Sequence, residues 1–385
     1  MNTPANTANA NATPNSDRFV IIMAGGRGER FWPVSREKTP KQLITLLGGR
    51  SFLQQAVDRV RPLVPAANIL IITNAVQAGT VRQQLPELPA GNVIAEPCGR
   101  DTCAAVALGA AIVAARSATG VMAVLPADHV IPEEAKFQQV LADSFARAAA
   151  ESVMVTIGIR PTEPATGYGY IHFGAPLPAL PGAAPAPTRF FTAQRFVEKP
   201  PLEKAEEYLR SGQYRWNAGM FIWSVPTVLA GLRAHQPEMA AAAERWRVAA
   251  AAGGDTLERV LAVEYPPIKK ISIDFALMEQ ARNVVMADGS FDWDDLGAWP
   301  ALARHLPADA AGNCAVGDFL QVDAANNIVY DARTRHRTPI AVVGLSDCII
   351  VQTDDAMLVA AKSKAQKIKD LVALLAKQDQ YKPLV

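Results

Sequence analysis

A short apolar strand opens directly into a glycine-rich segment near the start of the chain. The strand is predicted at Phe19–Met23, and glycine then occupies three of the next five positions. Because glycine has no side chain, the backbone N–H groups of such a segment can approach phosphate oxygens closely. The segment therefore predicts a phosphate-binding loop. The residues that we expect to bind a nucleotide through this loop are Ala24, Gly25, Gly26 and Gly28.

Two common phosphate-binding patterns do not fit this loop. The dinucleotide-binding pattern needs a further glycine or alanine three residues after Gly28, where this chain has Phe31. The Walker A pattern is absent as well. Taken alone, the segment is equally typical of a tight turn between a strand and a helix. Two cations close by in the sequence, Arg30 and Lys41, favour phosphoryl or nucleotidyl transfer.

Short apolar strands alternate with helices in the first part of the chain. This alternation predicts an α/β fold whose mostly parallel sheet is covered by helices on both faces. Ligands of such sheets bind at the carboxyl ends of the strands, where the glycine loop and Asp128 both fall. The predicted strands are Phe19–Met23, Ile69–Ile72, Val121–Leu125 and Val153–Ile157, and the predicted helices are Ser51–Val64, Thr102–Ala115 and Lys136–Ala150.

A Pro- and Ala-rich segment, Pro176–Pro187, is interpreted as a surface excursion. Beyond it the elements are less regular. We expect extended chain at Arg189–Val197 and Phe221–Trp223, and helices at Leu202–Arg210 and Ser272–Gln280.

The pattern changes after about His305. Short apolar runs separated by turn residues predict a small all-β unit, and an amphipathic helix follows at Lys364–Lys377. We therefore divide the chain into a disordered tail (1–17), an α/β catalytic domain (18–305) and a C-terminal β domain with a terminal helix (306–385). The apolar runs are Phe319–Val322, Ile328–Tyr330, Ile340–Val343, Cys348–Val351 and Met357–Val359.

Composition excludes several classes of protein. The 385 residues carry 38 basic and 37 acidic side chains, a net charge of +1, with no basic stripe for nucleic acid. No apolar run is long enough to cross a membrane, and the N-terminus is not a signal peptide. The four cysteines match no zinc spacing, which favours a reducing cytoplasm. A polyanionic substrate must therefore be bound by local cations and a metal ion.

The glycine loop together with Ser35-Arg36 and Pro40-Lys41-Gln42-Leu43 resembles the signature of the sugar-1-phosphate nucleotidyltransferases. It is most similar to their mannose-1-phosphate guanylyltransferase branch. The resemblance extends from about Val20 to Leu375. It implies a Rossmann-like nucleotidyltransferase domain, followed by a short left-handed β-helix that is often used for dimerisation, so we expect a homodimer formed through the C-terminal domain.

Two aspartates are the expected ligands of Mg²⁺. Asp128 lies in a segment that resembles the family's L-P-x-D-H motif, and Asp295 in one that resembles W-x-D-x-G-x-W. Two carboxylates meeting at one point repel each other unless a divalent cation lies between them, and Mg²⁺ accepts two protein carboxylates together with waters and phosphate oxygens. The alternative for Asp128 is a turn or helix cap. Asp292 and Asp294 are interpreted as surface charges.

The expected reaction joins two polyanions, so it needs cations and positioning more than a nucleophilic side chain. We assign Arg30 and Lys41, with Asp128 and Asp295, as the catalytic set. Alone, such an Arg or Lys is usually a solvated surface charge. Their place after the glycine loop favours a role in binding the triphosphate, with Lys41 reaching it.

Three further segments resemble the family's sugar-binding motifs. The alternative is a simple hairpin turn for the first segment and a charged pair before a proline that ends a strand for the second. The residues expected to bind the sugar phosphate are Gly169 and Tyr170 in Gly-Tyr-Gly-Tyr, Glu198 and Lys199 in Glu-Lys-Pro, and Asn217 in Trp-Asn-Ala-Gly-Met.

A segment that resembles the family's E-P-x-x-R-[ND]-T motif places Glu96 and Arg100 near the nucleotide base. Asp101 or Thr102 could instead cap the following helix.

These resemblances imply transfer of GMP from GTP to mannose 1-phosphate. The alternatives are a nucleotidyltransferase for another base or sugar, and an inactive regulatory homologue that keeps the fold. The chain leaves no room after its last helix for the isomerase domain of some relatives, so we expect no isomerase activity.

Overall fold

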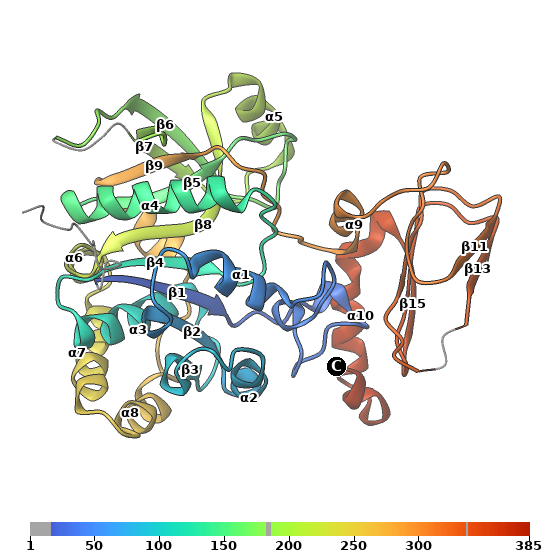
Figure 1. Ribbon diagram of the computed structural model, residues 1–385, viewed down its shortest axis with the longest axis horizontal. Helices are drawn as coiled ribbons and strands as arrows, with labels where there is room; N and C mark the ends of the chain where they lie inside the picture. Colours follow the sequence, from blue (N-terminus) through green and yellow to red (C-terminus); the bar gives the residue numbers. More distant parts are fainter. Residues whose placement is uncertain (1–16, 182–185, 336–337) are drawn as a thin grey trace, which may run out of the picture.

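The computed structural model describes residues 17–181, 186–335 and 338–385 (Figure 1). The predicted disordered tail therefore lies outside the described residues except for Asp17, whose carbonyl accepts a hydrogen bond from Val121 N. Part of the predicted surface excursion, residues 182–185, also lies outside them. Within the described chain, no helix is long and apolar enough to span a bilayer.

A nine-stranded sheet forms the larger body of the molecule. Its strand order is β3-β2-β1-β4-β8-β5-β9-β7-β6, with β8 also paired to β6. The bounds are β1 Arg18–Ala24, β2 Ile69–Asn74, β3 Val93–Glu96, β4 Val121–Pro126, β5 Met154–Ile159, β6 Tyr170–Pro176, β7 Phe190–Val197, β8 Tyr214–Ser224 and β9 Val284–Gly289.

The sheet is parallel in its first part and mixed beyond it. Strands β3, β2, β1 and β4 run parallel; β1, β2 and β4 were predicted, and β3 was not. Strand β8 is antiparallel to both β4 and β5. Only β5 and β9 pair in parallel in the second part. The carboxyl ends of the first four strands therefore share one edge, and the segments that follow β1, β3 and β4 all begin there.

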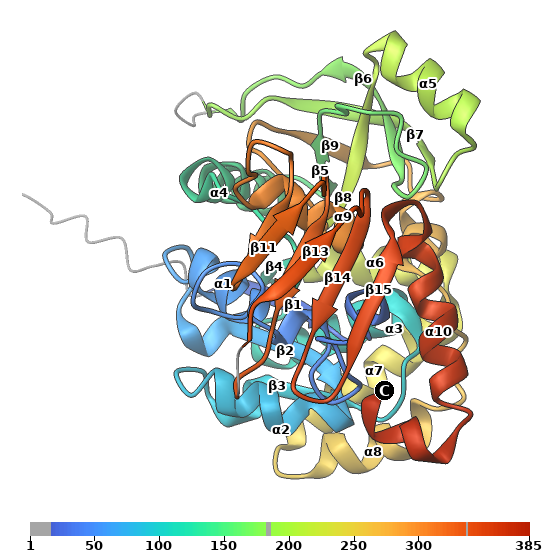
Figure 2. The same cartoon turned by 90° about the vertical axis from the view of Figure 1, so that its right-hand side faces the viewer.

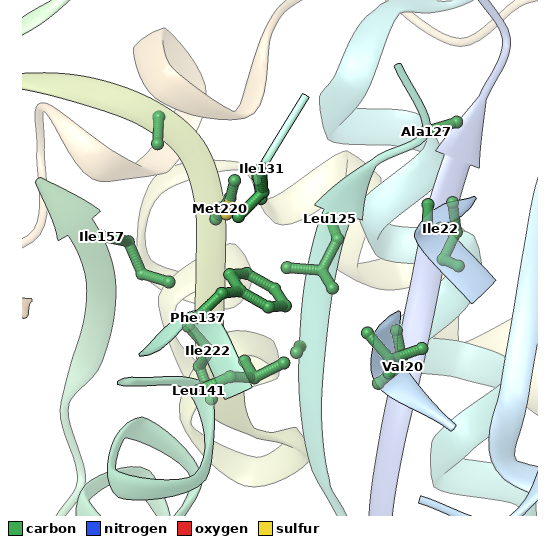
Figure 3. Packing of buried hydrophobic residues seen from close by; sticks show 14 of the residues in the cluster. Val20, Ile22, Leu125, Ala127, Ile131, Phe137, Leu141, Ile157, Met220 and Ile222 are labelled. Atoms are coloured by element: carbon green, nitrogen blue, oxygen red, sulfur yellow. The ribbon is translucent and has the colours of Figure 1, made fainter. Parts of the chain in front are cut away.

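Helices cover both faces of this sheet, so its central strands are buried on both sides. In β1, Val20 and Ile22 pack on the side of α1 and α4, and Phe19 and Ile21 pack on the side of α3 (Figure 3 shows the first side). The helix bounds are α1 Phe52–Val60, α2 Ala75–Gln84, α3 Asp101–Arg116, α4 Glu134–Ala150, α5 Leu202–Ser211, α6 Val225–His235, α7 Pro237–Ala252, α8 Thr256–Glu264, α9 Trp299–Leu302 and α10 Ile368–Leu375.

The structure confirms one predicted helix and corrects another. Helix α1 begins as expected, because Ser51 accepts a hydrogen bond from Gln54 N while the Gln54 side chain accepts one from Ser51 N. The helix predicted at Ser272–Gln280 is instead a single π-helical turn, Asp274–Met278. The N-cap position of α3 is Arg100, which makes no side-chain cap bond, but Asp101 Oδ1 accepts a hydrogen bond from Thr102 N at 2.8 Å and so satisfies one N–H of the first turn.

The C-terminal unit is a β-helix-like stack, which confirms the predicted all-β unit. Strands β10, β12 and β14 pair in parallel, β15 closes this sheet antiparallel, and β11 pairs in parallel with β13. Figure 2 faces this unit. The bounds are β10 Cys314–Val316, β11 Phe319–Val322, β12 Ile328–Asp331, β13 Ile340–Val343, β14 Cys348–Gln352 and β15 Met357–Ala361.

A separate apolar core joins the two bodies at the segment that follows the glycine loop. Phe31 and Trp32 pack there with Trp299 and with Ile368 and Val372 of α10. Polar contacts reinforce this junction, because the Trp299 indole donates to Trp32 O and the Trp32 indole to the backbone near the C-terminus. The position of the glycine loop therefore depends on the C-terminal unit.

Candidate active site

A cavity of about 370 Å³ lies at the carboxyl edge of the parallel strands. It gathers residues from segments far apart in the sequence: the glycine loop, the turn after Pro40, the end of β4, the loop after β9, and α10. Its polar lining residues are Arg27, Glu29, Arg30, Lys41, Asp128, His129, Asp295 and Lys369.

Gly28 is the residue of the loop at which no other amino acid fits. Its φ of 61° lies in the left-handed region, and a Cβ there would lie 2.4 Å from Lys41 Cβ and 2.7 Å from Lys41 N. Its carbonyl accepts a hydrogen bond of 2.8 Å from Ser35 Oγ. The absence of a side chain thus lets Lys41 pack directly against the loop.

The buried amide of Gln42 fixes the rest of the loop. Its Nε2 donates to Ala24 O at 2.7 Å and to Gly26 O at 2.9 Å. Ala24 O also accepts from Thr73 Oγ1 at 3.0 Å. These bonds engage loop carbonyls, and the backbone hydrogen bonds found among the described residues include none donated by the N–H groups of Gly25, Gly26 or Gly28.

Lys41 links the two predicted metal ligands. Its ammonium is almost fully buried and donates to Asp128 Oδ2 at 2.9 Å and to the backbone carbonyl of Asp295. Burial raises the pKa of Asp128, but the charge and hydrogen bond of Lys41, together with the smaller contributions of its other neighbours, outweigh burial, so this pKa lies below its ordinary value. Asp128 is therefore ionised at neutral pH, and its side chain remains 36% exposed to the cavity.

Asp295 receives a second contact from the opposite side of the site. The Tyr168 hydroxyl donates to Asp295 Oδ1 at 2.8 Å. Burial, and then the negative charge of Asp295, raise the pKa of Tyr168, so the phenol remains a donor. Asp128 and Asp295 thus line one cavity from distant parts of the chain.

The interpretation of Asp294 as a surface charge is wrong. Its side chain is buried, accepts from Arg304 Nε at 2.7 Å and Leu296 N at 2.8 Å, and lies 2.9 Å from His305 Nε2. Asp294 therefore holds the shape of the loop that presents Asp295. Asp292 is exposed, as expected.

His129 lies beside Asp128 as a neutral imidazole. Its Nδ1 accepts from the Trp293 indole at 3.0 Å, and burial lowers its pKa to about 4 against the opposing effect of Asp128 and Asp295. It therefore brings no charge to the cavity at neutral pH.

The carboxylates of Asp128 and Asp295 suit a hydrated divalent cation. Both present oxygen donors, which Mg²⁺ prefers, and at least Asp128 is held in its ionised form. Among the described residues no group of three or more His, Cys, Asp or Glu side chains has metal-binding geometry. A metal here would thus take only part of its coordination from the protein.

A second cavity, of about 780 Å³, adjoins the first and shares Arg30 and Asp295 with it. Lys199 lines it and pairs with Glu198 Oε1 at 2.7 Å. A Cβ on Gly169 would lie 2.6 Å from Glu198 Oε2 and 3.4 Å from Asn217 Cβ. The structure therefore brings the predicted residues Gly169, Glu198, Lys199 and Asn217 together.

Tyr170 is not brought into either cavity. It is fully buried, its hydroxyl donates to Ala165 O at 2.9 Å, and its ring packs on Tyr208. Tyr168, two residues earlier, lines the second cavity instead. Tyr170 is the first residue of strand β6 and its side chain enters the core, so the structure does not support its predicted contact with the sugar; Tyr168 is the tyrosine of the pair that lines a cavity.

A third cavity, of about 490 Å³, opens between the glycine loop and the start of α3. Glu96 is buried there, accepts a hydrogen bond from the Tyr265 hydroxyl, and has its pKa raised by burial to about 7. Arg100 lines the same cavity, with its guanidinium bonded to Pro266 O. Gly25 and Gly26 also line it, so the phosphate loop and the predicted base contacts share one space.

Comparison with known proteins agrees with this architecture. The family model described as nucleotidyl transferase matches residues 19–311, and the MannoseP isomerase/GMP-like beta-helix domain matches residues 317–375. The mannose-1-phosphate guanylyltransferase of Sinorhizobium fredii is 36% identical over 383 residues, which cover 98% of this chain and 71% of that protein. The chain belongs to the mannose-1-phosphate guanylyltransferase family.

Two other relatives of this guanylyltransferase-family chain extend the comparison. The xanthan biosynthesis protein XanB of Xanthomonas campestris pv. campestris (strain B100) is 37% identical over 360 residues, 93% of this chain and 73% of its own. A crystal structure described as mannose-1-phosphate geranyltransferase from Thermus thermophilus superposes with a TM-score of 0.78 at 34% identity. The match covers 93% of this chain and 99% of that one.

Sequence reasoning missed Asp274 in this guanylyltransferase-family site. Asp274 accepts from Asn217 Nδ2 at 2.7 Å and lines the third cavity; burial, and then Glu198, raise its pKa to about 6. The only signal in the sequence was an acid in a predicted helix. Nothing there showed that a π-helical turn would place it beside Asn217.

Replacing Gly28 with alanine should disable the site while the fold persists. The added Cβ must displace Lys41, and misplacing a catalytic group by about 1 Å can cost about 100-fold in rate. We expect a loss of turnover of about that size, measured as pyrophosphate release. Gly49→Ala is the matched control, because a Cβ at this exposed glycine outside the cavities meets nothing within 4 Å. Equal activity of the two variants would contradict the packing argument.

Proposed function

We propose that this protein transfers GMP from GTP to α-D-mannose 1-phosphate and releases pyrophosphate. The observation that supports it most is the convergence of Lys41, Asp128 and Asp295 on one cavity beside the glycine loop. Family membership supports the choice of substrates. In this reaction a phosphate oxygen of the sugar phosphate forms a bond to the α-phosphorus of GTP, while the bond to the leaving pyrophosphate breaks in line.

The site needs no general base, because the attacking phosphate oxygen is already an anion. The barrier arises from the approach of two polyanions and from charge that accumulates on the transferred phosphoryl group. The glycine-loop N–H groups, Arg30 and Lys41 bind the triphosphate in our proposal. Asp128 and Asp295 would hold Mg²⁺, which when bound would offset phosphate charge.

The second cavity suits the sugar phosphate. Lys199 is 63% exposed and can turn from Glu198 to a phosphate. Glu198 and Asn217 pack against Gly169, where a side chain would collide with the Glu198 carboxylate, so the glycine lets these two polar groups lie close together. We propose that these residues accept and donate hydrogen bonds to the sugar hydroxyls, and that Tyr168 forms one wall.

The base is assigned to the third cavity. Guanine presents N–H donors on the edge that distinguishes it from adenine, and a buried carboxylate is their natural acceptor. The Tyr265 hydroxyl holds one oxygen of Glu96, and the other lies toward Gly25. Glu96 and Arg100 are therefore our candidates for base recognition.

All four cysteines are free. Free thiols are ordinary in a reducing compartment, and we propose that the enzyme acts in the cytoplasm.

Pyrophosphate release in the presence of mannose 1-phosphate and Mg²⁺, compared among GTP, ATP, UTP and dTTP, tests this function. We expect GTP to give the highest kcat/KM, because the base cavity offers a carboxylate acceptor. GTP ranking among the poorest would refute the base assignment in favour of another nucleotidyltransferase. No release with any nucleotide would favour an inactive homologue.

Removing the Lys41 ammonium should reduce turnover by about 10²–10³-fold, because a preorganised donor aimed at developing charge is typically worth that much. Lys41→Ala is compared with Lys38→Ala, which removes an exposed lysine of the same segment. Far-UV circular dichroism should be unchanged in both. Normal turnover of a folded Lys41→Ala protein would refute the assigned role.

We also propose a homodimer formed through the C-terminal unit. Leu320, Val322 and Val343 lie on the paired strands β11 and β13 and are 62%, 59% and 69% exposed. Contiguous exposed apolar side chains of this kind mark interaction surfaces. Sedimentation should give a dimer for the native protein and a monomer for Val322→Asp/Val343→Asp; a monomeric native protein would contradict the proposal.

A further inference from the structure

The terminal helix α10 packs directly on the turn Glu29–Phe31, the segment that leaves the glycine loop (Figure 1). Its buried face is apolar: Ile368 and Val372 are 3% and 4% exposed and share a core with Phe31. The helix is therefore held in one orientation relative to the phosphate loop. Residues on the adjacent face of α10, which borders the first cavity, therefore have a fixed position there.

Lys369 follows Ile368 on this helix and lines the first cavity together with Arg30, Lys41 and Asp128. Its side chain is exposed, and no ion pair found among the described residues involves it. Lys367, two residues earlier on the same segment, pairs instead with Asp370 at 3.2 Å. Lys369 is therefore a cation directed by the fold to the cavity and not engaged by a protein carboxylate.

The charges around the cavity show why such a cation matters. Arg27 lies 3.6 Å from Glu29, and Lys41 is bound to Asp128. Their charges are thus partly balanced before any ligand arrives. Arg30 donates to Gly297 O, a neutral partner, so Arg30 and Lys369 keep their charges available. A triphosphate carries several negative charges, and its departing pyrophosphate gains more as the bond to the α-phosphorus breaks.

We propose that Lys369 binds the β- and γ-phosphates of the nucleoside triphosphate, and hence the departing pyrophosphate. This inference rests on the proposed nucleotidyl transfer. Lys369 takes part in no covalent step: the electron pair of the breaking P–O bond goes to pyrophosphate, whose charge the ammonium offsets. The C-terminal unit thereby completes the active site of the α/β domain instead of serving only as a dimerisation module.

The same segment also reaches the neighbouring cavity. Lys362 and Gln366, from the turn that precedes α10, line the cavity assigned to the sugar phosphate together with Lys199. The approach of α10 to the first cavity is thus part of a longer contact. A triphosphate bound where the first and second cavities meet would therefore contact both the α/β domain and the C-terminal unit.

Binding of inorganic pyrophosphate to the full chain, measured by calorimetry in the presence of Mg²⁺, tests the proposal without depending on base or sugar. Lys369→Ala should weaken this binding by about 10- to 100-fold, the range for one hydrogen bond to a charged group. Lys369→Arg should recover most of the affinity. Lys367→Ala is the matched control and should bind as the native protein does.

Steady-state kinetics separate this role from a structural one. With Lys369→Ala we expect a higher KM for GTP and for pyrophosphate in the reverse reaction, and an unchanged KM for mannose 1-phosphate. Equal pyrophosphate affinity of native and Lys369→Ala protein would overturn the proposal, as would equal losses in Lys369→Ala and Lys367→Ala. Pyrophosphate binding that depends on Lys369, in a protein with no GTP turnover, would support this site and refute the proposed function.

Discussion

The site depends on one buried ammonium group placed between two acidic loops. Lys41 Nζ donates to the Asp128 carboxylate and to the backbone carbonyl of Asp295, two residues that lie far apart in the sequence. Without this cation, the ionised Asp128 and the Asp295 carboxylate would repel each other across the cavity. The charge of Lys41 thus offsets this repulsion and holds the two loops together at the proposed metal site. It also explains the glycine at position 28, since any side chain there would collide with Lys41.

The C-terminal unit supports this arrangement from outside the α/β domain. Phe31, Trp32 and Trp299 form a core with α10, so the loop that leads to Lys41 is packed on one side by the β-helix-like unit. The apolar face of α10 fixes the helix, and its exposed lysine then lies at the phosphate cavity. The C-terminal unit therefore contributes to the lining of the cavity, and in our proposal the binding of the triphosphate depends on the integrity of the terminal helix.

Much of the fold and several of the site residues could be predicted from local sequence patterns. Strong apolar runs placed β1, β2, β4 and the strands β11 to β15, and Ser51 marked the start of α1. Long motifs located Lys41, Asp128 and Asp295, which the fold brings to one cavity. The rest required tertiary information. Which tyrosine of the Gly-Tyr-Gly-Tyr segment faces the cavity depends on where β6 begins, and the burial of Asp294 depends on Arg304 and His305 packing over it. Asp274 and Lys369 carry no local signal, because their roles arise only from what the folded chain places beside them.

The most direct test of this account is a crystal structure with Mg²⁺ and GDP-mannose bound. We predict one Mg²⁺ ion coordinated by carboxylate oxygens of both Asp128 and Asp295, with the Lys41 ammonium within hydrogen-bonding distance of a nucleotide phosphate oxygen or of Asp128. A structure in which the ion contacts neither aspartate, or in which the two carboxyl groups lie too far apart to share it, would contradict the central claim.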